Sequence, residues 1–305
     1  MPAIVNRKSK IVNGFTLIEV LVVVVLLAFI VTALMAVFNS TQTAFRASIT
    51  QTDVLEGGRS MMGLVKGDLE TMTPSFGRMP SINVNNEIVG PMGAVNFCAN
   101  TNSSFGPLQQ SLIGSDYRRT NVLENIFILG RANLNGQDCW LGAGYAVAGS
   151  ADGLYSLYRF ATNHPVTAIS PAFIFTNEFQ NFLLGITNGS RLIDGVVHLT
   201  VRPYDRNGRW MTNSYVYAGA VCVGTNRNVW YGAPAWGEVG FCMFSNTLPA
   251  AVDVELGVLE DRVLQRAESI GDFLARSNYL AQQAGKVHLF RQRIPIRNVD
   301  PSAYQ

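Results

Sequence analysis

A run of apolar residues from Phe15 to Phe38 constrains this chain more than any other feature. It holds 24 positions, and Glu19 is the only ionisable residue among them. As a helix, the run would extend about 36 Å, which is enough to cross a hydrocarbon core of roughly 30 Å. A carboxylate inside a membrane costs roughly 2.5–3.5 kcal/mol at the centre and less near the interface. Glu19 therefore indicates a function.

The charges on the two sides of this run predict its orientation. Arg7, Lys8 and Lys10 precede it, whereas the five residues 39–43 that follow it are uncharged. Basic residues concentrate on the cytoplasmic side of membrane spans. We therefore expect a single-pass protein with a cytoplasmic N-terminus, and with the remaining residues on the other side.

A secretory signal peptide and a plain signal anchor each explain only part of this segment. The apolar region of a secretory signal peptide has about 7–15 residues and ends in a small-residue cleavage site, whereas this run is longer and no such site closes it. A plain signal anchor explains the length and the basic flank. It does not explain Gly14 or the membrane-embedded Glu19.

The residues Gly14-Phe15-Thr16-Leu17-Ile18-Glu19-Val20-Leu21 resemble the class III leader of type IV pilins and pseudopilins. The resemblance implies that a prepilin peptidase cuts between Gly14 and Phe15 and then methylates the new amine of Phe15. Glu19 would be the fifth mature residue, where the family carries its assembly glutamate. Its presence argues against the one tip pseudopilin type that usually lacks it.

This leader implies an assembly chemistry. Glycine before the cut leaves the backbone open to a protease, and the amine of Phe15 is then a cation one helical turn from Glu19. Desolvated opposite charges must pair, because each alone costs several kcal/mol. An amine paired with Glu19 of a neighbouring subunit would set the axial register, as a buried polar group does in coiled coils. The alternative is a contact between Phe15 and Glu19 of the same chain.

The helical pattern continues beyond the membrane. Residues 39–73 place apolar side chains on one helical face, at Leu55, Met62, Val65, Leu69 and Met72, and Pro74 ends the pattern. Gly57, Gly58, Gly63 and Gly67 weaken the helix. They indicate a bend or a close approach of another backbone, or else have no structural meaning.

The remaining residues, 74–305, read as a β-rich head. Short alternating runs predict strands at 126–129, 154–160, 195–205, 211–223, 238–244, 251–259 and 287–296. The segment near 262–284 reads as a helical insertion, and 230–237 as an aromatic loop. The fold class is therefore α+β, a long N-terminal helix packed on a mainly antiparallel sheet, as in pilins.

The order of elements resembles the J-type minor pseudopilins of type II secretion. The matching segments are short: Arg59-Ser60-Met61-Met62, Asp68-Leu69-Glu70, Gly195-Val196, Tyr204-Asp205, Gly208-Arg209-Trp210, Leu248-Pro249-Ala250-Ala251-Val252-Asp253-Val254 and Arg293-Ile294-Pro295. The long segment around 80–150 and the helical insertion depart from that pattern. A minor type IV pilin of similar shape is the close alternative.

The four cysteines show no CxxC spacing, and the three histidines lie far apart, which gives no zinc pattern. An even count permits two disulfides outside the cytoplasm. Cys222 and Cys242 lie in consecutive apolar stretches and form the preferred pair; the alternative is four buried free thiols. We expect no cofactor. Asp253 and Glu255 are the weak candidates for calcium ligands, against a solvated strand face.

The sequence predicts a structural subunit that is not an enzyme. It contains no nucleophile elbow, P-loop, HExxH or dinucleotide fingerprint, and a net charge of +2 gives no electrostatic case for nucleic acid. The resemblance implies a bacterial inner-membrane protein with a periplasmic head, at or near the tip of a pseudopilus. Its partners would be prepilin peptidase, other pseudopilins or pilins through the N-terminal helix, and secretion cargo. The competing class is a membrane-anchored enzyme or receptor that uses the leader for delivery.

Overall fold

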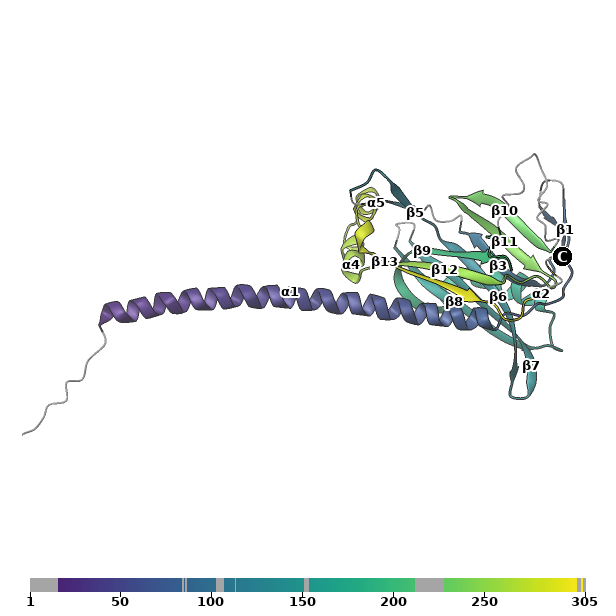
Figure 1. The fold of residues 1–305 in the computed structure, drawn as a ribbon, viewed down its shortest axis with the longest axis horizontal. Coiled ribbons are helices and arrows are strands. Elements are labelled where there is room, and N and C mark those ends of the chain that lie inside the picture. The colour runs from purple at the N-terminus through teal and green to yellow at the C-terminus, as the bar shows by residue number, and fades with distance from the viewer. Residues whose placement is uncertain are drawn as a thin grey trace, which may run out of the picture. The chain divides into compact units, whose positions relative to one another are not determined.

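A computed structural model describes residues 16–83, 85, 87–102, 107–112, 114–150, 154–211, 228–300 and 303. The described chain forms one long helix and a nine-stranded antiparallel sheet with short helices beside it (Figure 1). The chain divides between Ile49 and Thr50 into two compact units, which we describe separately. This is the α+β architecture that the sequence predicts.

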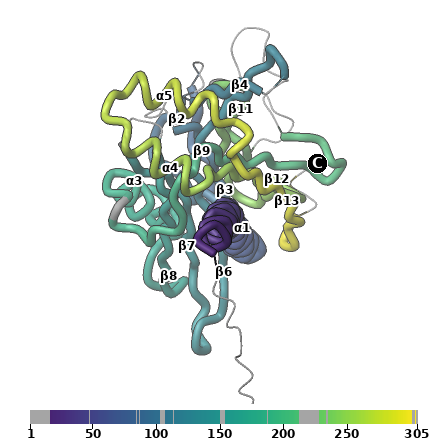
Figure 2. Tube along the Cα trace, turned by 90° about the vertical axis from the view of Figure 1, so that its left-hand side faces the viewer, coloured from purple at the N-terminus to yellow at the C-terminus, as the bar shows by residue number. Residues whose placement is uncertain are grey.

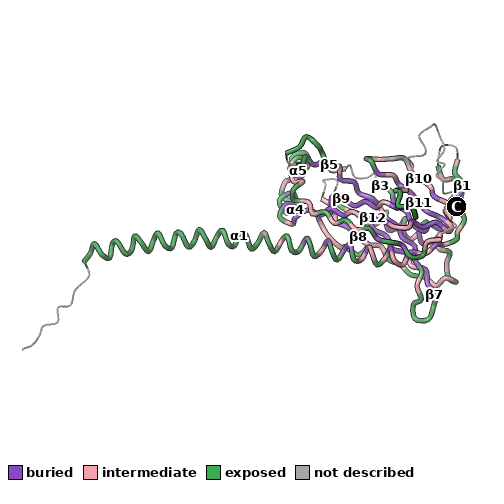
Figure 3. Tube along the Cα trace, viewed as in Figure 1, coloured by how far each residue is buried: buried purple, intermediate pink, exposed green. Residues whose placement is uncertain are grey.

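The long helix α1 runs from Leu17 to Glu70, 54 residues in all. The sequence predicts a helix to about Thr73, whereas α1 ends at Glu70. The N–H groups of Thr71 and Met72 donate to the carbonyls of Asp68 and Leu69, three residues earlier, so the last turn is no longer α-helical. In the first unit, every side chain that the structure describes is exposed (Figure 3). The apolar run therefore finds no cover within its own unit.

The large sheet of the second unit has the strand order β10-β11-β3-β6-β7-β8-β9-β12-β13, and each neighbouring pair is antiparallel. Consecutive hairpins join β6, β7 and β8, and a segment that contains short helices connects β8 to its neighbour β9. Hairpin β6–β7 projects beyond the rest of the sheet in both views (Figures 1 and 2). The strands are β3 (Val95–Thr101), β6 (Glu124–Leu134), β7 (Gln137–Ser150), β8 (Leu154–Pro165), β9 (Ser190–Tyr204), β10 (Val229–Ala235), β11 (Glu238–Phe244), β12 (Ala251–Leu259) and β13 (Val287–Pro295).

Two small hairpins and several short helices complete the second unit. The hairpins pair β1 (Ser81–Ile82) with β2 (Ile88–Val89), and β4 (Leu108–Ser111) with β5 (Arg118–Asn121). The helices are α2 (Pro171–Phe173), η1 (Ile174–Phe179), α3 (Gln180–Leu184), η2 (Ile186–Asn188), α4 (Asp261–Glu268), α5 (Phe273–Ala281) and η3 (Ala284–Lys286).

The main core lies between the C-terminal part of α1 and one face of the sheet. Alternate residues of β6 point to opposite faces, and Ile126 and Ile128 belong to this core. The helix contributes the buried side chains of Val54, Met61, Met62, Val65 and Leu69. The predicted apolar face is thus confirmed at Met62, Val65 and Leu69, whereas Leu55 is 36% exposed.

Short helices cover the opposite face of the sheet. Phe127 and Leu129 of β6 pack there against Phe175, Phe179 and Phe182 from the segment 171–184. Sequence reasoning missed this helical segment, although its three phenylalanines are spaced four and three residues apart, which places them on one helical face. The segment near 262–284 is helical as predicted, and it forms two helices, α4 and α5, which cover Val197 and Leu259.

The glycines of α1 fall into two classes. A Cβ on Gly58 would lie 2.2 Å from the ring of Phe290 on β13, and one on Gly57 would lie 3.2 Å from Ile193. These two glycines admit side chains of the sheet, where we expected another backbone. A Cβ on Gly63 or Gly67 would meet nothing within 4 Å, so no described atom of this chain requires a glycine there.

Strand β9 changes partners along its length. It leaves β8 after Val196, and its Leu199 then donates to the carbonyl of Val122, 2.9 Å away, just before β6. The next free amide, Val201 N–H, donates to the Glu124 carboxylate at 2.7 Å. Glu124 thereby satisfies a backbone donor where no ladder partner is present.

The disulfide and the aromatic loop differ from prediction. Cys242 is bonded to Cys98, not to Cys222, because Cys98 and Cys242 are directly opposite on the adjacent strands β3 and β11. Cys222 lies outside the described residues, and Cys139 is a buried free thiol. The predicted aromatic loop is largely strand β10, and its hairpin turn to β11 contains Trp236 and Gly237 at positive φ.

Candidate functional site

The start of α1 is closed by two reciprocal hydrogen bonds. Thr16 precedes the first helical residue, and its N–H donates to Glu19 Oε2 at 2.8 Å. In return, the N–H of Glu19 donates to Thr16 Oγ1 at 3.4 Å. This is a capping box, in which two helix-end donors are satisfied by side chains. Sequence reasoning missed this role of Glu19, although the Thr-x-x-Glu spacing signals it.

The capping arrangement leaves part of the Glu19 carboxylate available. Thr16 contacts this carboxylate, and the Glu19 side chain is exposed. The helix that follows is the one described helix long and apolar enough to cross a membrane. The segment therefore combines an apolar helix that is consistent with a membrane anchor and an exposed carboxylate at the start of that helix.

The other end of α1 is fixed to the sheet by an ion pair. Asp68 Oδ1 and Oδ2 accept from Arg159 Nη2 and Nε at 2.8 and 2.9 Å, and Tyr145 OH also donates to Oδ2. This hydrogen bonding raises the pKa of the Arg159 guanidinium, and burial raises the pKa of Tyr145. A charged network therefore supplements the apolar packing of the helix.

A comparison with protein-family models matches residues 10–35 to the prokaryotic N-terminal methylation motif. The chain carries this motif. The match is consistent with the type IV pilin and pseudopilin family, so the predicted family is confirmed at this level, without a distinction among its branches. A search of curated proteins and a search of solved structures each gave no match.

The matched range 10–35 contains Gly14, Phe15 and Glu19, the three residues that the sequence predicts for processing and assembly. Glu19 lies in the first turn of α1, whereas Gly14 and Phe15 lie outside the described residues. The motif implies processing by a prepilin peptidase and assembly with other pilin-like subunits. The motif therefore supports a type IV pilin-like or pseudopilin-like subunit, and the apolar helix is consistent with a membrane anchor.

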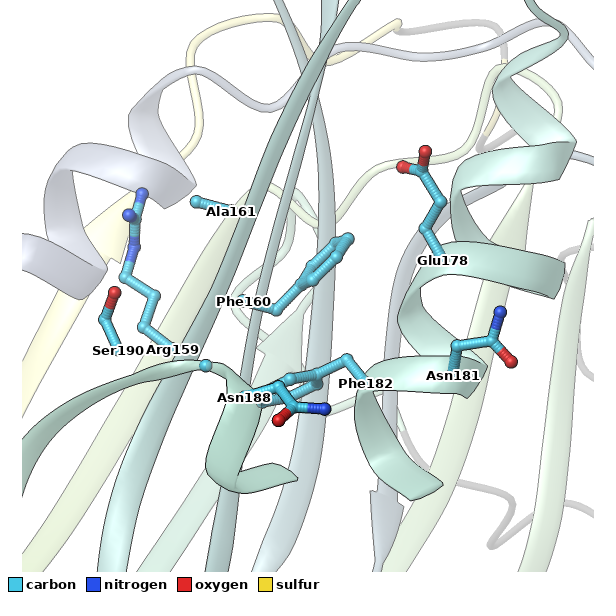
Figure 4. Close-up of a pocket in the computed structure, with 9 residues that line it drawn as sticks. Arg159, Phe160, Ala161, Glu178, Asn181, Phe182, Asn188 and Ser190 are labelled. Carbon is cyan, nitrogen blue, oxygen red and sulfur yellow. The ribbon is translucent and has the colours of Figure 1, made fainter. Parts of the chain in front are cut away.

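A cavity of about 340 Å³ adjoins Arg159, the partner of Asp68. It lies between β8 and the segment from η1 to η2, with Arg159 on one side and Glu178 on the other (Figure 4). The rings of Phe160 and Phe182 lie between them, 5.6 Å apart. Glu178 Oε1 lies 2.7 Å from His164 Nε2, within hydrogen-bonding distance.

The two candidate calcium ligands are engaged with arginines. Asp253 lies 2.6 Å from Arg293 Nε and 2.9 Å from Arg291 Nη2, and these bonds lower the pKa of Asp253. Glu255 lies 3.5 Å from Arg119. Within the described parts of the chain, no group of three or more His, Cys, Asp or Glu side chains is arranged to hold a metal ion.

Proposed function

We propose that this chain is a minor pseudopilin-like subunit of a type II secretion pseudopilus. After cleavage following Gly14 and N-methylation of Phe15, it would be held in the bacterial inner membrane by residues 15–38, with its head in the periplasm. The N-terminal methylation motif joined to a 54-residue helix carries this proposal. Assembly would draw the helix out of lipid into a bundle of neighbouring helices.

The exposure of Glu19 supports an intermolecular role for this carboxylate. Thr16 is the described residue that donates to it, and a methylated N-terminal amine of a neighbouring subunit would supply a further donor and the opposite charge. Such a pair forms in a low-dielectric environment only if both groups are hydrogen-bonded. The capping box would hold the carboxylate at the helix start in position for that contact.

The choice of the secretion branch rests on the short J-type segments of the sequence, several of which lie together in the head. The ring of Tyr204 lies 4.0 Å from the guanidinium carbon of Arg293, and Tyr204 also bridges to Trp210 across the turn at 205–209. The N–H of Ala250 donates to the carbonyl of Tyr204 at 2.8 Å. Segments that are far apart in the sequence thus form one corner of the head.

Mass spectrometry of the protein from cells with and without prepilin peptidase tests the processing step. The proposal predicts a chain that begins at Phe15 and carries one methyl group, and an intact N-terminus when the peptidase is absent. A chain that keeps residues 1–14 in peptidase-containing cells would defeat the proposal.

Substitution of Glu19 tests assembly separately from processing. Glu19→Val should be cleaved and methylated normally but fail to enter filaments that contain the other pilin-like subunits. Glu56→Val, which changes an exposed glutamate of the same helix, is the matched control. Normal incorporation of Glu19→Val would remove the registry role and leave delivery to the membrane as the function of the leader.

Deletion of the gene separates the pseudopilus from its alternative. Loss of enzyme secretion into the medium, with adhesion, motility and DNA uptake unchanged, is the expected result. The opposite result would assign the chain to a type IV pilus as a minor pilin. We also propose that the head is neither catalytic nor cofactor-dependent, as its sequence indicates. A catalytic activity abolished by a point substitution in the head would overturn this part.

A further inference from the structure

A groove of about 620 Å³ lies on the second unit, far from the N-terminal motif in sequence. Its walls are the segment 75–81, the segment 89–94 and the start of α2. Met79, Pro80, Val89 and Met92 give it an apolar lining. The neighbouring hairpin strand β1 lies at the end of the sheet opposite to α4 and α5 (Figure 1).

The wall segments are in direct backbone contact, so the groove is a built feature. A Cβ on Gly93 would lie 2.0 Å from the carbonyl oxygen of Arg78, and one on Gly77 would lie 2.9 Å from Cβ of Ala94. Ser75 N–H donates to the buried Asn96 side chain at 2.9 Å, and Ser75 Oγ donates to the carbonyl of Ala94 at 3.2 Å.

Phe76, between two residues that line the groove, is held in an unfavourable conformation. Its φ is 55°, in the left-handed region that bulky residues avoid, which costs about 1–3 kcal/mol. Its ring is nevertheless 69% exposed. Its N–H donates to the carbonyl of Ser245 at 3.0 Å, and Asn96 donates to that same carbonyl at 2.9 Å. The fold therefore holds Phe76 in a strained backbone conformation while its side chain is exposed and belongs to no hydrophobic core.

Arg78 places a positive charge at the groove. Arg78 is exposed, and it makes no ion pair with any residue that the structure describes. A cation beside an apolar groove favours a ligand that combines apolar side chains with a carboxylate, because arginine binds carboxylates in two-point fashion. Methionine side chains adapt to different apolar ligands, and aromatic, Met and Arg residues are enriched at protein interfaces.

We infer that this groove and the adjoining Phe76 bind an extended segment of a partner protein that carries apolar side chains and at least one carboxylate. The rigid display of Phe76 reduces the entropy lost on binding. The backbone contacts between the walls keep the groove open without a ligand. This surface belongs to the head and does not depend on assembly through the N-terminal helix.

Selection from a random phage-displayed peptide library tests the inference. The full-length chain is placed in lipid nanodiscs that are captured through their scaffold protein, and binders to empty nanodiscs are removed. Enriched peptides should combine acidic and apolar residues. Their synthetic versions should bind Arg78→Glu about tenfold more weakly or worse, because a charge-assisted contact is replaced by repulsion, and should bind Arg118→Glu unchanged. Arg118 is the matched control, an exposed arginine on β5.

Phe76→Gly distinguishes a binding role from a structural one. Glycine accepts the positive φ, so the melting temperature should be unchanged or higher while peptide affinity falls. Tyr117→Ser, which removes another exposed ring, should leave affinity unchanged. Three results would overturn the inference: no enrichment above empty nanodiscs, enriched peptides without acidic residues, or equal losses in Arg78→Glu and Arg118→Glu.

Discussion

Asp68 on α1 and Arg159 on β8 form a two-point ion pair with N–O distances of 2.8 and 2.9 Å. The pair joins the last turns of the long helix to the centre of the sheet, and both side chains are mostly buried. Burial strengthens the pair and also makes it costly to break, since the remaining charge would lose its partner.

Asp68→Asn should therefore destabilise the head. We expect a loss of about 2 kcal/mol, less than for a fully buried pair because water reaches part of Arg159. Arg131→Ala breaks the exposed pair with Asp138 and should cost less than about 1 kcal/mol. Chemical denaturation of the full chain in detergent measures both. Equal effects would mean that Asp68 and Arg159 contribute no more than a surface pair.

The glycines of α1 should respond in opposite directions to alanine. Gly58→Ala places a methyl group against the ring of Phe290 and should destabilise by about 1–3 kcal/mol. Gly63→Ala and Gly67→Ala meet no neighbour and should each stabilise by about 0.5–1 kcal/mol. Thermal unfolding distinguishes the two classes. If Gly63→Ala raises stability but lowers filament incorporation, a neighbouring subunit approaches the helix at that position.

Glu124 should make the head less stable as the pH rises. Burial raises the pKa of Glu124 to about 8, whereas an unfolded glutamate titrates near 4.3. Between these values the folded chain holds a proton that the unfolded chain has released, so stability falls with increasing pH. Glu124→Gln removes this dependence. The stability of this variant relative to the unaltered chain should therefore be greater at pH 8 than at pH 5, by on the order of 3 kcal/mol. Denaturation at a series of pH values measures the difference, and parallel curves would contradict it.

His198 should make the head less stable as the pH falls below about 6.5. Burial lowers its pKa to about 3, and Arg119 and Arg202 contribute to the shift. Glu255 is 3.8 Å away but does not outweigh them, so the imidazole is neutral and accepts from Val122 N–H at 3.0 Å. Unfolding below about pH 6.5 lets the histidine take up a proton, which destabilises the fold. His198→Asn keeps an acceptor near Nδ1 and should lose less stability between pH 6.5 and 5 than the unaltered chain does.

The disulfide can be assigned by peptide mapping without reduction. We expect a peptide that links Cys98 to Cys242, and a Cys139 that is alkylated only after unfolding, because it is buried. Removing both linked cysteines should cost about 2–5 kcal/mol, since the bond closes a long loop. A peptide that links Cys222 to Cys242 would contradict the structure.

The local patterns in the sequence were sufficient for the N-terminal helix. The apolar length and the basic flank predict a membrane helix, and the leader pattern predicts the N-terminal motif. The spacing of Met62, Val65 and Leu69 predicts the buried face of α1. Each of these features depends on residues within a few helical turns, so the sequence contains the whole signal. The strands at 251–259 and 287–295 were predictable for the same reason, because a period of two is a local property.

Contacts between distant residues were not predictable in this way. Cys242 bonds to Cys98 because β11 pairs with β3, 144 residues earlier in the chain. The sequence spacing instead favoured Cys222. Likewise, 230–237 read as a loop by its glycines, proline and aromatics, yet pairing with β11 makes it an edge strand.

The sequence by itself determined the anchor, the position of Glu19 and the α+β class, because period, length and flanking charge are properties of neighbouring residues. The tertiary structure alone decided what each polar group does. It pairs Asp68 with Arg159, uses Glu124 in place of a strand partner, and strains Phe76 beside a groove. These outcomes depend on strand order and register, which bring together residues that no local pattern connects.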